Sequence, residues 1–223
     1  MEQLLKDDEK KDDFQKRVFV GGGMALAAIA VILIGPPFSS LVGFALLIAL
    51  LIEWVRLSMK PFGDQPHLTL GLLVLGFLYV GLSGFWLLDV LGDDQGWRTL
   101  FPLLLMVTTT DIAAYFVGKN MGTTKLWPSV SPNKTWAGFW GGMIVGSFVG
   151  IVSLYLFQTP HISLWIVPVL ILVAQGGDLF ESKIKRIVKV KDSGNLIPGH
   201  GGLLDRLDSL LAVAFFLALW NGF

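Results

Sequence analysis

The sequence predicts an all-α polytopic integral membrane protein with about seven transmembrane helices. Three observations support this fold class. Hydrophobic residues occupy 53% of the 223 positions and charged residues only 15%, whereas soluble proteins carry about 25% charged residues. The mean hydropathy is +0.66, and long uncharged runs alternate with short polar segments. The 26 glycines and 8 tryptophans suit close helix packing and interfacial belts.

The charge and cysteine content excludes several classes of function. Lysine plus arginine (17) balance aspartate plus glutamate (17), so no nucleic-acid partner is expected. There is no cysteine, and therefore no disulfide framework, thiolate zinc site or cysteine nucleophile. Because the total charge is balanced, only the location of the charged residues in the sequence can indicate the function.

The N-terminal part is expected to contain a tail and two helices. Residues 1–17 are charge-dense and predict a cytoplasmic tail, and residues 18–223 predict a single transmembrane catalytic domain. The uncharged run at 18–35 comes close to spanning a hydrocarbon core of about 30 Å. Pro36-Pro37 ends this helix, because proline removes a backbone donor, and a second helix is expected over 38–55.

The remaining apolar runs predict five more helices. The uncharged stretch between Thr135 and Gly177 is too long for one span, and the polar segment 158–163 divides it into two. The other three helices are expected at residues 68–88, 99–117 and 209–223.

The distribution of cations predicts the orientation. If the N-terminus is cytoplasmic, only Arg98 of the 17 lysines and arginines falls outside, as the positive-inside rule requires. The two larger inner segments, 118–134 and 181–206, then face the same side. A cytoplasmic nucleotide could reach both of them.

The segment from Asp178 to Asp208 concentrates carboxylates, cations and glycines beside apolar helices. Carboxylates suit Mg²⁺, which usually binds through one or two of them plus substrate phosphates. Lysine and arginine suit phosphate, and glycines allow the backbone to approach it closely. These features indicate a metal-bound polyphosphate at the membrane surface. The alternative for the basic stretch KIKRIVKVK, taken alone, is binding of anionic lipid headgroups.

Two stretches resemble one known family. From Ser182 to Asp208 the pattern S-x-I-K-R, K-D-x-G and I-P-x-H-G-G-L-x-D-R-L-D is similar to the signature of the phosphatidate cytidylyltransferases, or CDP-diacylglycerol synthases. A second stretch, D-x-x-A-Y-x-x-G from Asp111 followed by S-P-x-K-T-x-x-G from Ser131, also looks like that family. The resemblance covers roughly residues 100–220, about half of the chain. Family members often have more apolar segments before this core.

The resemblance implies a reaction of CTP with phosphatidic acid that gives CDP-diacylglycerol and pyrophosphate at the membrane bilayer. The lipid phosphate attacks the α-phosphorus of CTP. Because this nucleophile is already anionic, the site needs charge neutralisation and positioning more than a general base. The resemblance also favours a homodimer, which the sequence does not decide.

The candidate residues fall into three groups. The expected Mg²⁺ ligands, with a second metal left open, are Asp178, Asp205 and Asp208. The other expected catalytic residues are Lys185, Arg186 and Arg206, which would contact phosphates, and His200, which would donate to a phosphate or orient a ligand; a general base is the less favoured role for it. The expected substrate-binding residues are Asp111, Lys125, Ser131, Lys134, Thr135, Lys191, Gly201 and Gly202.

Other readings of the sequence lead to different expectations. CTP-dependent transfer to another lipid acceptor, an ether-lipid phosphate or a polyprenol, is a close variant. A small cation-coupled transporter would use Asp111 and Asp178 inside the membrane, and a scaffold would need neither. Glycines recur every fourth residue from Gly138 to Gly150 and predict close helix packing, within the chain or across a homodimer. The spacing of Glu53 and Arg56 predicts a local pair.

Overall fold

The computed structural model describes residues 21–59, 66–159, 162–197 and 201–221, and this part of the chain is almost entirely helical. Every predicted apolar run coincides with a helix, and the all-α fold class is confirmed. The predicted tail at 1–17 lies outside the described residues. The helices are Gly21–Ile34, α2 (Phe38–Ser58), α3 (Pro66–Gly92), α4 (Trp97–Met121), α5 (Trp136–Leu156), α6 (Val167–Ile187) with the short 3₁₀ helix η1 (Leu164–Ile166) before it, and α7 (Leu204–Asn221).

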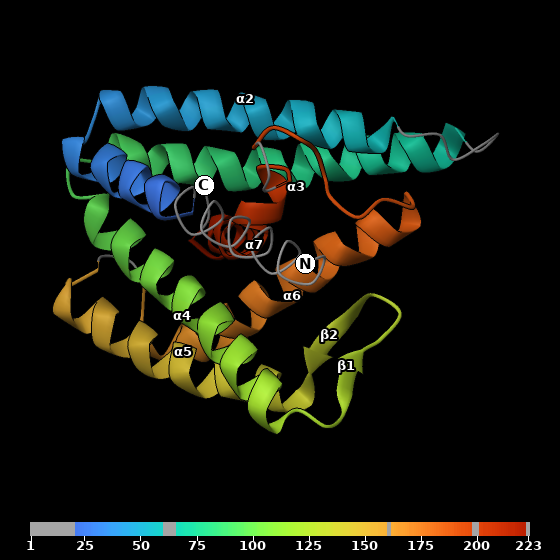
Figure 1. Cartoon of the computed structure of the whole chain (residues 1–223). Coiled ribbons are helices and arrows are strands. Elements are labelled where there is room, and N and C mark those ends of the chain that lie inside the picture. The colour runs from blue at the N-terminus through green and yellow to red at the C-terminus, as the bar shows by residue number, and fades with distance from the viewer. Residues whose placement is uncertain (1–20, 60–65, 160–161, 198–200, 222–223) are drawn as a thin grey trace, which may run out of the picture.

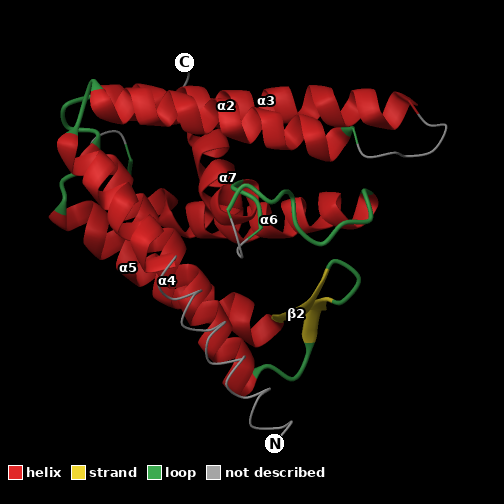
Figure 2. Ribbon diagram, turned by 45° about the horizontal axis from the view of Figure 1, so that its top comes forward, coloured by secondary structure: helices red, strands yellow, loops and turns green. Residues whose placement is uncertain are grey.

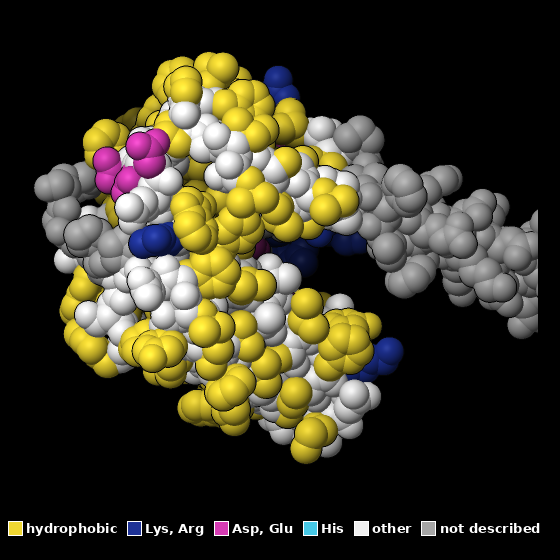
Figure 3. Space-filling model, turned by 90° about the vertical axis from the view of Figure 1, so that its left-hand side faces the viewer, with side chains coloured by type: hydrophobic (Ala, Val, Ile, Leu, Met, Phe, Trp, Pro, Cys, Tyr) yellow, Lys and Arg dark blue, Asp and Glu magenta, His cyan; other side chains and the backbone are white. Residues whose placement is uncertain are grey.

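Five of these helices are long and apolar enough to cross a membrane. They are α2, α3, α4, α5 and the continuous stretch Leu164–Ile187 that contains α6. The helix at Gly21–Ile34 is apolar but shorter. The side of the molecule in Figure 3 is dominated by hydrophobic side chains, as a lipid-facing surface requires. The chain is a polytopic integral membrane protein.

The helices form two antiparallel pairs with a third pair between them (Figures 1 and 2). One outer pair is α2 with α3, and the other is α4 with α5. Helices α6 and α7 lie between the outer pairs, where α7 packs on α3 and α6 packs on α5. This arrangement places the C-terminal ends of α4 and α6 and the start of α7 within reach of one another.

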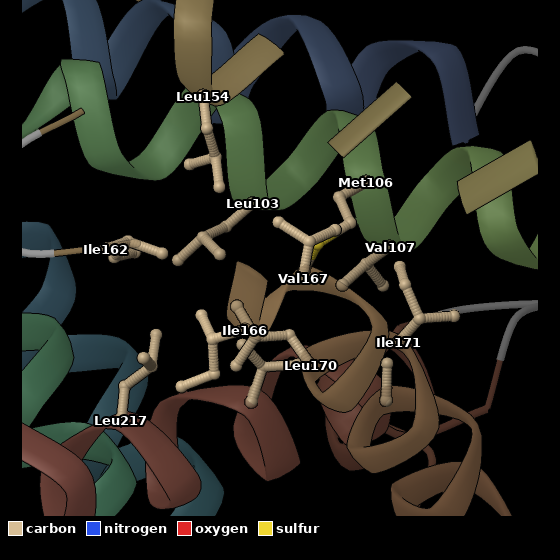
Figure 4. Close-up of a cluster of buried hydrophobic side chains, with 12 residues drawn as sticks. Leu103, Met106, Val107, Leu154, Ile162, Ile166, Val167, Leu170, Ile171 and Leu217 are labelled. Atoms are coloured by element: carbon tan, nitrogen blue, oxygen red, sulfur yellow. The ribbon is translucent and has the colours of Figure 1, made fainter. Parts of the chain in front are cut away.

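The main core joins α4, α5, α6 and α7. Figure 4 shows Leu103 and Met106 of α4 pointing toward Val167 and Leu170 of α6, with Leu217 of α7 closing one side. All five side chains are almost completely buried. Because protein interiors are close-packed, this core fixes α6 against its neighbours. The acidic residues at the inner end of α6 are therefore held on a rigid element.

The glycine stripe of α5 packs against α4 within the same chain. The buried members are Gly138, Gly142, Gly146 and Gly150. A Cβ on Gly138 would lie 2.5 Å from the carbonyl oxygen of Ala114, and one on Gly142 would lie 3.1 Å from that of Thr110. Of the two alternatives for this stripe, the structure shows packing within the chain.

This close approach gives a prediction for Gly138→Ala. The added methyl group would press on α4 backbone, so we expect the free energy of unfolding to fall by about 1–3 kcal/mol. Gly176→Ala is the matched control, because a Cβ there meets no atom within 4 Å and alanine should stabilise the helix by about 0.5–1 kcal/mol. Thermal unfolding in detergent measures both. Equal shifts for the two variants would contradict the packing.

The inner segments contain more regular structure than the sequence predicts. Helix α6 continues to Ile187 and α7 begins at Leu204, so both ends of the predicted loop 181–206 are helical. The other inner segment folds into an antiparallel hairpin of β1 (Lys125–Trp127) and β2 (Ser131–Thr135). The hairpin leads directly into α5, where the Thr135 hydroxyl accepts a hydrogen bond from the Gly138 amide at 3.1 Å and caps the helix.

Candidate functional site

A cavity of about 580 Å³ lies at the C-terminal ends of α4 and α6, beside the hairpin. Its volume is in the range of small-molecule sites. Five predicted site residues line it: Asp111, Lys125, Lys134, Thr135 and Asp178. Tyr115, Leu126 and Phe139 contribute apolar walls, and Gly118, Gly122 and Gly138 leave room for an occupant. The structure therefore brings Asp178, which begins the segment 178–208, to the same cavity as the stretch that begins at Asp111.

An ion pair at the cavity wall links Asp178 to the stretch that begins at Asp111. The Lys134 ammonium of β2 lies 2.5 Å from Oδ2 of Asp178 on α6. Both side chains keep between a quarter and a third of their surface exposed (27% and 30%), so each remains accessible to a ligand. The Asp178 Oδ1 also accepts a weak hydrogen bond from Ser182, one turn along α6. The Lys134 ammonium and the Asp178 carboxylate therefore lie side by side, where both can contact a ligand in the cavity.

Asp205 is fully engaged by protein donors. Its Oδ1 lies 2.6 Å from the Lys185 ammonium, and its Oδ2 accepts hydrogen bonds from the amides of Ser193 and Gly202, each at 2.9 Å. Burial alone would raise the pKa of Asp205, but these donors outweigh burial and lower it to about 2. Asp205 therefore holds the loop before α7 onto its own helix and onto α6.

Asp208 lies one turn further along α7, near other carboxylates. Burial raises the pKa of Asp208 above its usual range, and the negative charge of Asp178 adds to the effect, as does that of Asp111. The Tyr79 hydroxyl of α3 donates to the Asp208 carbonyl at 3.3 Å and fixes this turn from the other side. The negative charges of Asp178 on α6 and Asp111 on α4 therefore both act on Asp208 of α7.

The carboxylates of Asp111, Asp178 and Asp208 have the oxygen chemistry that a divalent cation needs, and Mg²⁺ at this place stays a prediction. Among the described residues, no group of three acidic or histidine side chains is close enough to hold an ion without further ligands. Hard carboxylate oxygens are nevertheless the donors that Mg²⁺ prefers, and it usually takes its remaining ligands from water and substrate phosphates. Asp205 is engaged most heavily, because three protein donors occupy its two oxygens. Asp178 also pairs with Lys134 and Ser182, and Asp208 accepts a hydrogen bond of 2.7 Å from the Ser209 amide, so a cation would share these oxygens with protein donors.

Three other predicted site residues stabilise the local structure. The Arg186 guanidinium donates to the carbonyls of Val130 and Val190, each at 3.3 Å, and so ties the hairpin to the end of α6. Lys185 contacts Glu181 at 3.4 Å in addition to Asp205. Gly201 has a positive φ of 87°, a conformation that favours glycine. The phosphate-binding roles predicted for these three residues stay predictions.

The remaining predicted residues lie at the edges of this region or outside it. Lys191 and Arg206 are exposed, and Ser131 begins β2 in a half-buried position. The amide of Gly202 is the donor to Asp205. His200 lies outside the described residues.

Sequence reasoning missed two buried glutamates. Glu181 of α6 is 3% exposed and lies beside Lys185. Its spacing from Asp178 and Lys185 places all three side chains on one face of the helix. This spacing was overlooked because α6 was expected to end earlier in the sequence. Glu53 of α2 is 4% exposed. Instead of pairing locally with Arg56, its Oε2 accepts a hydrogen bond from the Leu204 amide at 2.7 Å, and no local pattern indicates this contact.

Comparisons with known proteins place this chain in a family. The model of the Cytidylyltransferase family matches residues 63–222. The phosphatidate cytidylyltransferase of Bacillus subtilis is 42% identical over 151 residues, which cover 66% of this chain and 56% of the relative. That of Brucella suis is 46% identical over 151 residues, covering 66% and 55%. That of Staphylococcus epidermidis is 40% identical over 152 residues, covering 66% and 56%.

The residues that the family model matches include every residue that lines the cavity and both stretches that resemble the family. The alignments extend over only 55–56% of each of these relatives, so the chain spans about half the length of the curated relatives it matches. The family match extends over most of the chain. The chain belongs to the cytidylyltransferase family.

Proposed function

We propose that this chain transfers the cytidylyl group of CTP to phosphatidic acid, giving CDP-diacylglycerol and pyrophosphate, at the cytoplasmic face of the inner membrane. The observation that carries the proposal is the meeting of Lys134 and Asp178 at the wall of one cavity. The relatives named phosphatidate cytidylyltransferase support the same activity. The excess of cations on one predicted side supports the orientation.

The proposed reaction needs charge neutralisation and alignment. An oxygen of the lipid phosphate forms a bond to the α-phosphorus of CTP, while the bond from that phosphorus to the bridging oxygen breaks and pyrophosphate leaves. Lys125 and Lys134 line the cavity and can neutralise phosphate oxygens as charge develops. No proton needs to be removed from the lipid phosphate, because it is anionic at neutral pH. The rigid helices around the cavity supply the alignment.

We propose that Mg²⁺ accompanies the triphosphate. Held by Asp178 and Asp208, it would neutralise phosphate charge and stabilise the departing pyrophosphate. The mutual repulsion of the carboxylates around Asp208 supports this assignment. Lys134 already pairs with Asp178 in the structure, so it lies next to the position that the phosphates would take.

The lipid is expected to enter from the bilayer beside α4. The cavity wall on that side carries Tyr115 and Phe139, and Tyr115 is 60% exposed. Aromatic side chains with a polar end suit the interface between acyl chains and headgroups. The phosphate of the lipid could then reach Lys134 and Asp178 while its acyl chains remain in the membrane.

The proposal is tested by measuring pyrophosphate release from purified protein in detergent with CTP, phosphatidic acid and Mg²⁺. Release that needs all three components is expected. Release of CDP instead would show transfer of the γ-phosphate, as in a polyprenol kinase. Pyrophosphate formed only with an ether-lipid phosphate would change the acceptor. No reaction with any of these lipids, together with cation flux in proteoliposomes, would favour the transporter.

A further inference from the structure

Glu53 is a buried carboxylate far from the signature segment in sequence but in contact with it in space. It lies near the inner end of α2, ten residues before the family match begins at residue 63. Its side chain is only 4% exposed. Its Oε2 accepts a hydrogen bond of 2.7 Å from the amide of Leu204, 151 residues away. A buried charge is costly unless it is hydrogen-bonded, so this contact requires an explanation.

The start of α7 explains why a remote carboxylate is needed. The first amides of a helix have no partner inside the helix, and serine, threonine, aspartate or asparagine usually caps them. The residues just before α7 are Gly202 and Leu203, whose side chains carry no acceptor. Glu53 supplies the missing acceptor, and its negative charge is favourable at the positive end of the helix dipole.

The loop before α7 is shaped to admit this carboxylate. A Cβ added to Gly194 would collide with Oε1 of Glu53, and a Cβ added to Gly202 would collide with both Oε1 of Glu53 and Oγ of Ser193. Ser193 is 2% exposed. Gly194 and Gly202 therefore leave the space that the Glu53 carboxylate of α2 fills, and a side chain at either position would collide with it.

The contact adjoins the residues that support the proposed reaction. The amides of Ser193 and Gly202, on either side of the Glu53 carboxylate, are the ones that donate to Asp205. Asp205 begins the turn of α7 that presents Asp208 toward Asp178 and Asp111. A shift of the Leu204 amide would therefore move both aspartates. A displacement of about 1 Å can cost about 10²-fold in rate.

We infer that Glu53 is a positioning residue of the cytidylyltransferase site, which caps α7 from α2 and fixes the loop that Asp205 holds. The inference rests on the proposed function for its catalytic readout, but the anchoring contact can be measured without it. It also assigns a role to α2, a helix outside the family match. That helix completes the site although it does not line the cavity.

The experiment compares three Glu53 variants of the full chain in detergent. Glu53→Gln keeps an acceptor at the same reach, Glu53→Asp keeps the charge but shortens the side chain, and Glu53→Ala removes both. Arg56→Ala, an exposed change one turn away on α2, is the matched control. Hydrogen exchange of the peptide covering 201–206 reports the anchor, and kcat and KM for CTP report its effect on the reaction.

We expect exchange at Leu204 to rise by about tenfold or more in Glu53→Ala and Glu53→Asp, because a hydrogen bond to a charged group is lost. We expect kcat in both to fall by about 10- to 100-fold while KM changes less. Glu53→Gln should recover most of both properties, and Arg56→Ala should match the original protein. A merely structural role would change hydrogen exchange and stability but leave the kcat of the folded variants close to that of the original protein.

The outcomes separate this inference from the proposed function. Unchanged exchange at Leu204 in Glu53→Ala and Glu53→Asp would overturn the inference, as would exchange that rises equally throughout α2 and α3. Normal kcat in a variant with increased exchange would overturn the positioning role. If the original protein transfers no cytidylyl group, the proposed function fails. In that case a rise in exchange confined to the loop still supports the anchor.

Discussion

Asp178→Asn is expected to lower the rate of cytidylyl transfer by about 10²- to 10³-fold while the protein remains folded. Asp178 is an acidic residue of the cavity wall, and its ion pair with Lys134 joins α6 to the hairpin. Asparagine keeps the shape of the side chain but removes the negative charge that would hold a cation and orient Lys134. Because both partners are partly exposed, little stability should be lost. Steady-state kinetics and thermal unfolding measure the two effects.

The control for Asp178→Asn is the same change at Asp93, an exposed residue between α3 and α4 that lies away from the cavity. Asp93→Asn should leave kcat unchanged. A double-mutant cycle with Lys134→Met then tests whether Lys134 and Asp178 act as a unit. Groups in contact give non-additive effects, so the double variant should be little worse than Asp178→Asn alone. Full activity of Asp178→Asn, or strictly additive losses, would contradict this description of the site.

Asp205→Ala should cause the largest loss of stability among the site variants. The change leaves the Lys185 ammonium without its closest partner and leaves the amides of Ser193 and Gly202 without their acceptor. Breaking such a pair by removing one partner costs about 3 kcal/mol. Thermal or denaturant unfolding of the purified protein, without any substrate or metal, measures this loss. Stability equal to that of the original protein would contradict the anchoring role.

The Mg²⁺ dependence of Asp205→Asn distinguishes the two roles considered for Asp205. If Asp205 anchors the loop, kcat falls but the Mg²⁺ concentration that gives half of the maximal rate stays close to the original value. If it is a metal ligand, as the family resemblance implies, that concentration rises. The engagement of both Asp205 oxygens by protein donors favours the first result. The role of Asp205 as a metal ligand stays a prediction until this comparison is made.

The helices could be predicted because their signal is local and strong. In lipid, every backbone polar group must be satisfied within the element, so each long apolar run had to become a helix. The same runs also fixed which polar segments lie together at one end. Lys134 and Asp178 were both named from the sequence, and the structure shows them in contact.

The missed features depend on contacts between distant parts of the chain. The hairpin was not predicted, because its segment contains Pro128 and Pro132 and has no regular alternation of apolar and polar residues. Its position is fixed instead by Arg186 of α6, which binds the Val130 carbonyl. The role of Glu53 depends on an amide 151 residues away. No local spacing could indicate either contact.

The central claim is that one site, where Lys134 and Asp178 meet at the cavity wall, transfers the cytidylyl group to a lipid phosphate. The most direct measurement incubates the protein with phosphatidic acid, Mg²⁺ and CTP labelled with ³²P at the α-phosphorus, and then separates lipid from nucleotide. We expect label in the lipid fraction for the original protein and almost none for Asp178→Asn. Label that remains entirely in nucleotide with the folded original protein, for phosphatidic acid and for other lipid phosphates, would contradict the claim.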